Sequence, residues 1–317
     1  MKKIILSLLF IITLVLIGWP LNSQLRSNKQ ATEPDPDKLQ LITSFYPLYF
    51  FTQTIAAERA QVYNLTAAGV DPHDYEPTPA DLRLIETADL IISNGAGFES
   101  WLDNLDTQVP ILHSADDLAS ISREKEEGDD HDEEEEEDDH GTLDPHVWLD
   151  PVLASAQVQQ IADALSELDA AGRDFYQANA RQLQAELATL DQEFTQGLTS
   201  CRLEQVITAH AAFAYLAQRY GFQQVAIQGL SHEEEVTAAQ LASIAELAKA
   251  QEIKYVFFES LLSPRLAQTL AQEVGASVLL FDPLENLDAE QARAGADYFS
   301  IQRQNLNNLQ RALECQP

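Results

Sequence analysis

The sequence is short of basic residues, sulfur and enzyme signatures. Its 317 residues include 19 Lys and Arg against 51 Asp and Glu, which gives a net charge of −32. This charge excludes nucleic acid as a partner, because phosphate binding depends on Lys and Arg. No nucleotide-binding P-loop is present, so the chain itself does not hydrolyse ATP. No His-Glu-x-x-His helix or other hydrolase motif is present either.

A single long apolar run lies at the N-terminus. Ile4–Gly18 follows Lys2 and Lys3 and is shorter than the ~20 residues of a membrane span. We therefore predict that residues 1–23 are a secretory signal peptide and that residues 24–38 are a flexible leader. An uncleaved anchor stays open, because no small-x-small cleavage site is visible. No Cys lies near the run, so we do not expect a lipid anchor.

The chain has only two cysteines, Cys201 and Cys315. Export would place them in an oxidising compartment, where an even count favours one disulfide. Such a bond would tie the C-terminus to the second half of the chain. Two free thiols are the alternative.

From Leu39 onwards, strand-like and helix-like segments alternate, which predicts parallel sheets covered by helices. Residues 173–199 interrupt the alternation with one long apolar stripe at helical spacing. We predict an α/β fold of two lobes, each with a mostly parallel sheet, joined by one long helix. The N-terminal lobe would span 39–171, the linking helix 172–200 and the C-terminal lobe 201–317. The last expected helix runs from about Ala289 to Leu313.

A strongly acidic segment breaks the first lobe. Residues 124–140 hold 13 acids and one Lys. No packed core can form from such a segment, so we expect a disordered loop over residues 122–141. The loop could be a solvated charge run, or it could collect cations weakly through its carboxylates together with His131 and His140.

Three histidines occupy comparable positions. His73 and His210 each follow a predicted strand and precede a helix, and His146 lies in a Pro-bracketed segment before a helix. Asp282 directly follows the last predicted strand. Ligands of open α/β sheets bind beyond the carboxyl ends of strands. Three imidazoles and one carboxylate suit tetrahedral Zn²⁺, so we predict a zinc site made of these four residues.

The segments around these residues resemble the periplasmic zinc-binding solute-binding proteins of ABC-type importers, the high-affinity zinc-uptake family. The resemblance covers the chain from about residue 40 to the end. It implies two lobes joined by a rigid helix, a zinc ion between them, a periplasmic location and an ABC-type permease as partner. The family's ligands correspond to His73, His146 and His210, with Asp282 at the position of a fourth ligand. The segments are Pro72–Glu76, Asp144–Pro151, Thr208–Tyr215 and Phe281–Leu284.

Other polar residues have secondary roles in this interpretation. Glu76 is a second candidate oxygen ligand, and water could also fill the fourth position. We expect Glu259, at the end of a strand, to accept a hydrogen bond from a ligand imidazole. His232 is more typical of a helix start than of a metal site, and we interpret His113 as structural.

The predicted function is extracytoplasmic capture of Zn²⁺ by a monomeric binding protein that is not an enzyme. In the manganese-binding relatives that the resemblance implies, the third position is Glu, so His210 favours zinc over manganese. A secreted zinc hydrolase would also need three protein ligands and an open position. A surface adhesin that merely holds metal is a third possibility.

Overall fold

The computed structural model describes residue 35 and residues 37–121, 143–230 and 236–316. The predicted signal peptide, nearly all of the leader, His131, His140 and His232 lie outside the described residues. Within the described residues, no helix combines the length and the apolar character needed to cross a membrane.

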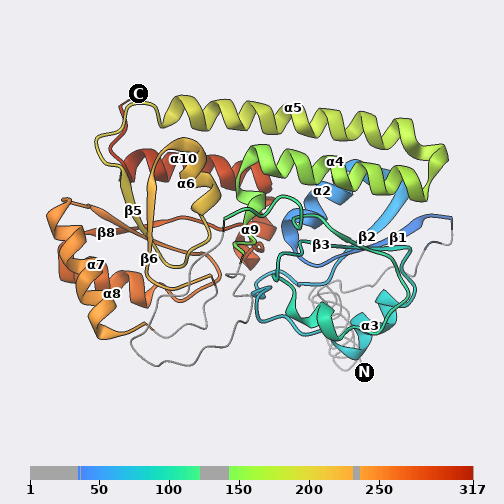
Figure 1. Cartoon of the computed structure of the whole chain (residues 1–317), viewed down its shortest axis with the longest axis horizontal. Coiled ribbons are helices and arrows are strands. Elements are labelled where there is room, and N and C mark those ends of the chain that lie inside the picture. The colour runs from blue at the N-terminus through green and yellow to red at the C-terminus, as the bar shows by residue number, and fades with distance from the viewer. Residues whose placement is uncertain (1–34, 36, 122–142, 231–235, 317) are drawn as a thin grey trace, which may run out of the picture. The chain divides into compact units, whose positions relative to one another are not determined.

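Two parallel four-stranded sheets form the framework (Figure 1). The first has the order β2-β1-β3-β4 and the second the order β6-β5-β7-β8, so the second half of the chain repeats the topology of the first. All strand pairs are parallel, as the alternating pattern predicts. The strands are β1 (Leu39–Thr43), β2 (Ala60–Asn64), β3 (Leu90–Ser93), β4 (Ile111–His113), β5 (Gln205–Thr208), β6 (Gln223–Ala226), β7 (Tyr255–Phe258) and β8 (Ser277–Leu280).

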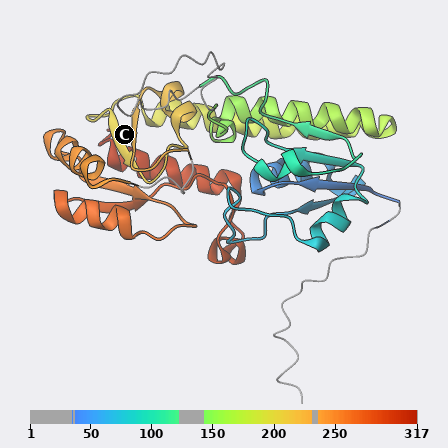
Figure 2. The same cartoon turned by 60° about the horizontal axis from the view of Figure 1, so that its bottom comes forward.

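Helices flank both sheets, which confirms the predicted fold class. Helix α2 packs on β1 and β2, and α8 packs on β7 and β8 beside α7 (Figure 2). The α-helices are α2 (Tyr46–Ala56), α3 (Pro79–Ile85), α4 (Pro151–Leu168), α5 (Arg173–Gly197), α6 (Ala214–Tyr220), α7 (Ala238–Ala250), α8 (Arg265–Val274), α9 (Ala289–Ala294) and α10 (Tyr298–Ala312). Single 3₁₀ turns are η1 (Ala57–Arg59), η2 (Ser100–Asn104), η3 (Val147–Leu149) and η4 (Ala170–Gly172).

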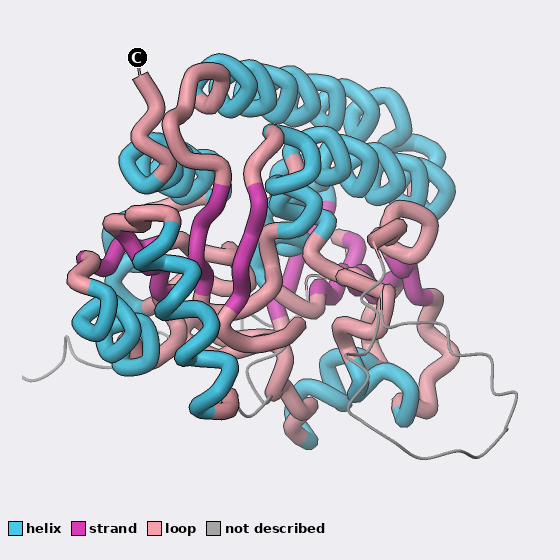
Figure 3. Tube along the Cα trace, turned by 60° about the vertical axis from the view of Figure 1, so that its left-hand side comes forward, coloured by secondary structure: helices cyan, strands magenta, loops and turns pink. Residues whose placement is uncertain are grey.

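Helix α5 is the long helix between the two sheets. Its 25 residues span about 38 Å at 1.5 Å per residue. It lies beside α4 (Figure 3) and contacts α2 from the first half and α10 from the second. The predicted apolar stripe is buried throughout, because it faces these neighbours; its members are Tyr176, Leu183, Leu187, Leu190, Phe194 and Leu198. The helix therefore packs on elements of both halves.

The C-terminal region differs from the prediction of one helix. The chain forms two helices, because Gly295 adopts a left-handed conformation (φ +71°) and ends α9. Asp297 then starts α10 by accepting a hydrogen bond from the backbone N–H of Ser300. Beyond α10, Cys315 forms a disulfide with Cys201. This bond joins the two cysteines as predicted.

Candidate metal centre

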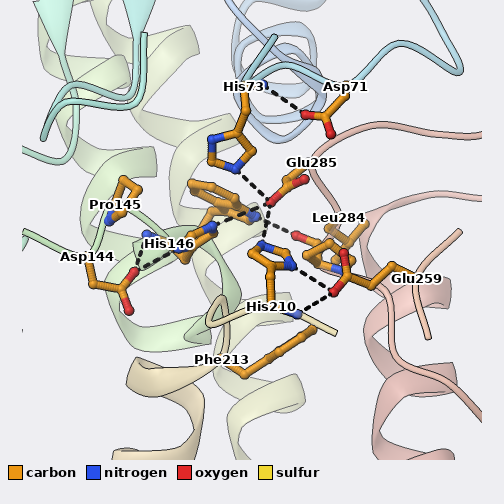
Figure 4. Close-up of polar contacts among 12 residues, drawn as sticks. Asp71, His73, Asp144, Pro145, His146, His210, Phe213, Glu259, Leu284 and Glu285 are labelled. Atoms are coloured by element: carbon orange, nitrogen blue, oxygen red, sulfur yellow. Dashed lines mark hydrogen bonds and ion pairs between the residues drawn. The ribbon is translucent and has the colours of Figure 1, made fainter. Parts of the chain in front are cut away.

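Four buried or nearly buried side chains converge on one point between the two sheets (Figure 4). His73, His146, His210 and Glu285 each offer one donor atom, and the four atoms lie within 4.8 Å of one another. The side chains of His146 and His210 are 0% exposed, that of Glu285 is 1% exposed and that of His73 is 11% exposed. Such a group is the kind of donor set that binds a transition-metal ion.

The distances from Glu285 to the three imidazoles are close to those of a tetrahedral zinc site. Glu285 Oε1 lies 3.2 Å from His73 Nε2, 3.4 Å from His146 Nε2 and 3.1 Å from His210 Nε2. In a tetrahedron with metal–ligand bonds of about 2.1 Å, the ligand atoms are about 3.4 Å apart. His146 Nε2 is buried without a hydrogen-bond partner among the described residues, as expected for an atom reserved for a ligand. The carboxylate oxygen therefore lies at the spacing from each imidazole nitrogen that a small tetrahedral cation would require.

His73 and His146 are each positioned by a turn of the same kind. Asp71 Oδ1 accepts a hydrogen bond from the backbone N–H of His73 at 2.9 Å. Asp144 Oδ1 does the same for His146 at 2.9 Å, and it also lies 2.8 Å from the Nδ1 atom of that ring. In both cases Asp-Pro precedes the histidine, and the Asp side chain closes the turn two residues on, as Asp commonly does.

His210 is positioned from the second sheet. It follows β5, and Glu259 at the end of β7 accepts from its backbone N–H at 3.1 Å, while the His210 Nδ1 atom is 2.7 Å from Glu259 Oε1. Glu259 thus contacts the imidazole of His210, as expected for the carboxylate at this strand end, while the role of His210 as a metal ligand stays a prediction. A carboxylate on Nδ1 keeps the proton at that atom, so that loss of the second proton would leave the Nε2 lone pair facing the centre.

The carboxylate of this donor group belongs to Glu285, a residue that the sequence analysis did not consider, and the group does not include Asp282. Asp282 lies outside the group: its Oδ1 accepts from the backbone N–H of Leu284 at 2.8 Å, and its Oδ2 accepts from Gln291 Nε2 at 2.7 Å. Asp282-Pro283-Leu284 thus repeats the turn of Asp71-Pro72-His73. The shared Asp-Pro pair marks this turn in the sequence, but only the tertiary structure shows which later carboxylate reaches the imidazoles.

Two other candidates do not join the group. Glu76 is exposed and is absent from the donor set of the described residues. His113 lies on β4, where its Nδ1 atom is 2.8 Å from Ser93 Oγ, in line with a structural role.

Aromatic rings pack against two of the donor imidazoles. The His73 ring packs on Phe98 with centroids 4.7 Å apart, and the His146 ring lies 5.1 Å from that of Trp148. Trp148 Nε1 donates to the carbonyl oxygen of Pro283 at 2.8 Å. This bond connects the segment of His146 to the loop of Glu285. The low-polarity surroundings strengthen electrostatic interactions within the group.

Without metal, the group is stabilised by opposite charges. Burial alone would raise the pKa of the Glu285 carboxyl, but its electrostatic interactions with the His73 and His210 imidazoles hold that pKa well below its usual range. Burial alone would lower the pKa of His210, but Glu259 and Glu285 raise it to about 10. Burial is likewise outweighed at His146, whose pKa is raised by the Asp144 carboxylate. A binding cation must therefore displace protons from imidazoles.

Comparison with known proteins identifies a family. Residues 41–312 match the family model described as "Zinc-uptake complex component A periplasmic". The high-affinity zinc uptake system protein ZnuA of Bacillus subtilis is 37% identical over 292 residues, which cover 90% of this chain and 91% of that protein. Zinc-binding lipoprotein AdcA of Streptococcus pneumoniae is 37% identical over 319 residues, 99% of this chain, but the match spans only 62% of AdcA.

Comparison with a solved structure agrees with the family match. The Zn(II)-bound ZnuA-like domain of Streptococcus pneumoniae AdcA superposes with a TM-score of 0.73 at 35% identity. The match covers 87% of this chain and 99% of that one.

Proposed function

Because the chain belongs to the family of periplasmic zinc-uptake complex A components, we propose that it captures Zn²⁺ outside the cytoplasmic membrane and delivers it to an ABC-type permease. The permease would supply ATP hydrolysis, since the sequence has no P-loop. The predicted signal peptide supports the extracytoplasmic location. In this proposal the protein acts as a monomer.

The observation that carries the proposal is the donor group of three imidazoles and one carboxylate. We propose His73, His146, His210 and Glu285 as the zinc ligands. Imidazole nitrogens favour zinc over manganese, which prefers oxygen-rich octahedral sites. Asp282 would support the loop of Glu285 instead of binding metal.

The same geometry argues against the hydrolase alternative. A catalytic zinc needs an open position for water or substrate, whereas here Glu285 stands at the fourth position. Its side chain is 1% exposed, which leaves no access for an organic substrate beside the ion. We therefore propose that the protein is not an enzyme.

The predicted division into lobes 39–171 and 201–317, joined by a linking helix over 172–200, remains part of this proposal. Two separate four-stranded sheets of the same topology support it. Two of the proposed ligands follow strands of the first sheet, and two follow strands of the second. Zinc would then bind where the lobes meet.

Equilibrium zinc competition with a chelator tests the proposal. His210→Ala removes one proposed ligand and should abolish tight binding. His113→Ala removes an exposed histidine of β4 that is outside the donor group and should leave binding unchanged. Metal analysis of both variants and of the unaltered protein, purified from the native envelope, should find zinc in all but His210→Ala. Undiminished affinity in His210→Ala would remove this residue from the site.

A further inference from the structure

His73 is the most accessible of the four donors. Its side chain is 11% exposed, whereas those of the other three are at most 1% exposed. His73 also lies on the loop between β2 and α3, while His210 directly follows β5 of the second sheet. An ion that leaves the centre with the least displacement of protein therefore passes the segment of His73.

A tight turn precedes His73 in the chain. The backbone N–H of Val70 donates to the carbonyl of Ala67 at 3.0 Å, and Gly69 within the turn has φ +83°. Asp71 and Pro72 connect this turn to His73, and Pro restricts the rotation of that connection. Movement of the turn is therefore transmitted to the imidazole.

The turn is held by the residue next to Glu285. Asn286 is 2% exposed, and its Nδ2 atom donates to the carbonyl of Ala67 at 2.7 Å and to that of Val70 at 2.9 Å. The backbone N–H of Gly69 donates to the carbonyl of Leu287 at 2.8 Å. Three hydrogen bonds thus join the turn before His73 to the loop that carries Glu285.

We infer that Asn286 is a positioning residue that sets how long zinc stays bound, because its amide must release residues 67–70 before His73 can withdraw from the ion. The inference rests on the proposed function and deepens it. Glu285 binds the ion directly, and Asn286 holds the segment of the accessible ligand in place. A single amide nitrogen has two N–H groups for the two carbonyls, which a carboxylate in the same place lacks.

The consequence is kinetic. Loss of the two side-chain hydrogen bonds leaves all four donors in the chain, so zinc coordination is retained while opening becomes easier. Two hydrogen bonds correspond to a change of about tenfold or more in the opening equilibrium, so the zinc off-rate rises by about the same factor. The dissociation constant rises with the off-rate.

The experiment measures zinc dissociation by stopped flow with excess chelator on full-length protein. Asn286→Ala removes the two bonds. Gly69→Ala tests the same contact from the exposed turn, where a Cβ meets nothing within 4 Å but is strained at a positive φ. Asn308→Ala is the matched control, since Asn308 Nδ2 donates to the carbonyl of Leu280 at 2.8 Å, within the second half of the chain. Thermal unfolding of each metal-free variant reports general destabilisation.

We expect zinc to dissociate faster from Asn286→Ala and Gly69→Ala, but not from Asn308→Ala. The zinc X-ray absorption spectrum should be unchanged. Unchanged off-rates in both Asn286→Ala and Gly69→Ala would overturn the inference and leave the proposed function intact. An off-rate raised equally by Asn308→Ala would overturn it as well, because the effect would then follow general destabilisation. If the unaltered protein binds no zinc, the proposed function fails and the inference fails with it.

Discussion

Glu259 holds His210 at two atoms of the same residue. Its Oε1 atom accepts a hydrogen bond from the His210 backbone N–H at 3.1 Å and lies 2.7 Å from the ring Nδ1. Asp144 holds His146 in the same way, at 2.9 and 2.8 Å. Each carboxylate thus fixes both the backbone and the ring orientation of its histidine. The same carboxylate–histidine arrangement thus occurs in both halves of the chain, and in each it directs an imidazole Nε2 towards the shared centre.

Glu259→Gln should weaken zinc binding without removing a ligand. The amide keeps the size of the side chain but lowers the basicity that the carboxylate gives to the imidazole. Loss of such an outer partner typically reduces metal affinity by about 10–100-fold. Chelator competition measures the change, with Glu273→Gln, at an exposed side chain of helix α8, as the control. Equal affinities for both variants would remove the role assigned to Glu259.

Separate substitutions of Glu285 and Asp282, which both follow β8, should distinguish the proposed zinc ligand from the residue that supports its loop. Glu285→Gln removes the proposed oxygen ligand, and we expect a greater loss of zinc affinity than the roughly 10–100-fold typical of an outer partner. Asp282→Asn keeps an acceptor for the Leu284 N–H but places an amide donor opposite the Gln291 amide donor, so we expect mainly lower stability, by about 1–3 kcal/mol. Zinc titration and denaturant unfolding of both variants measure the two effects. The opposite order of affinities would restore Asp282 as the ligand.

Zinc affinity should rise with pH across the neutral range. Because the pKa of His210 is raised to about 10 and that of His146 is also raised, zinc must displace protons from both imidazoles. Apparent affinity then changes by about tenfold per pH unit for each proton displaced. Calorimetry in buffers of different ionisation enthalpy counts the protons released. Binding that releases no proton at neutral pH would contradict the charge state assigned to the metal-free group.

Above neutral pH, the stability of the metal-free protein should fall as the pH rises, whereas zinc affinity should rise. The pKa of His210 is raised above its ordinary value of 6.5, so its contribution is fully present below about pH 6.5 and is lost as the pH rises towards 10. The pKa of Glu285 is lowered, so its contribution is present above about pH 4.5 and is lost as the pH falls through the lowered value. Denaturant unfolding at a series of pH values measures both limits.

Deletion of residues 124–140 should leave one tight zinc site intact. All four donors lie outside this segment, and the described residues on either side are already joined, because the backbone N–H of Asp144 donates to the carbonyl of Ile121 at 2.8 Å. The predicted role of the acidic loop, with His131 and His140, is weak binding of additional cations. Calorimetry should therefore show loss of weak sites only. Loss of the tight site would refute this separation.

Much of the framework could be predicted because it depends on local pattern. Helix α4 is determined locally, because Asp150 caps its first turn and Pro151 stands at its first position. The histidines were found because each follows a strand or a Pro-containing turn. The break at Gly295 was missed because its neighbours favour helix and one left-handed residue ends the run.

The choice between Asp282 and Glu285 could not be made from position along the chain. Both carboxylates follow β8, and only tertiary structure shows which one reaches the imidazoles. The Asp282 side chain is used by its own turn, whereas Glu285 extends to within 3.4 Å of three histidines that are distant in sequence. Convergence of this kind depends on how the two sheets pack, which no local pattern records.

X-ray absorption at the zinc edge, combined with metal analysis of the purified protein, tests the central claim most directly. The structure predicts one tightly bound zinc per chain, coordinated by three imidazole nitrogens and one carboxylate oxygen at about 2.0–2.2 Å. In Glu285→Gln the carboxylate contribution should be lost while the three imidazoles remain. A spectrum with fewer than three imidazoles, or one unchanged by Glu285→Gln, would contradict the site described for this protein.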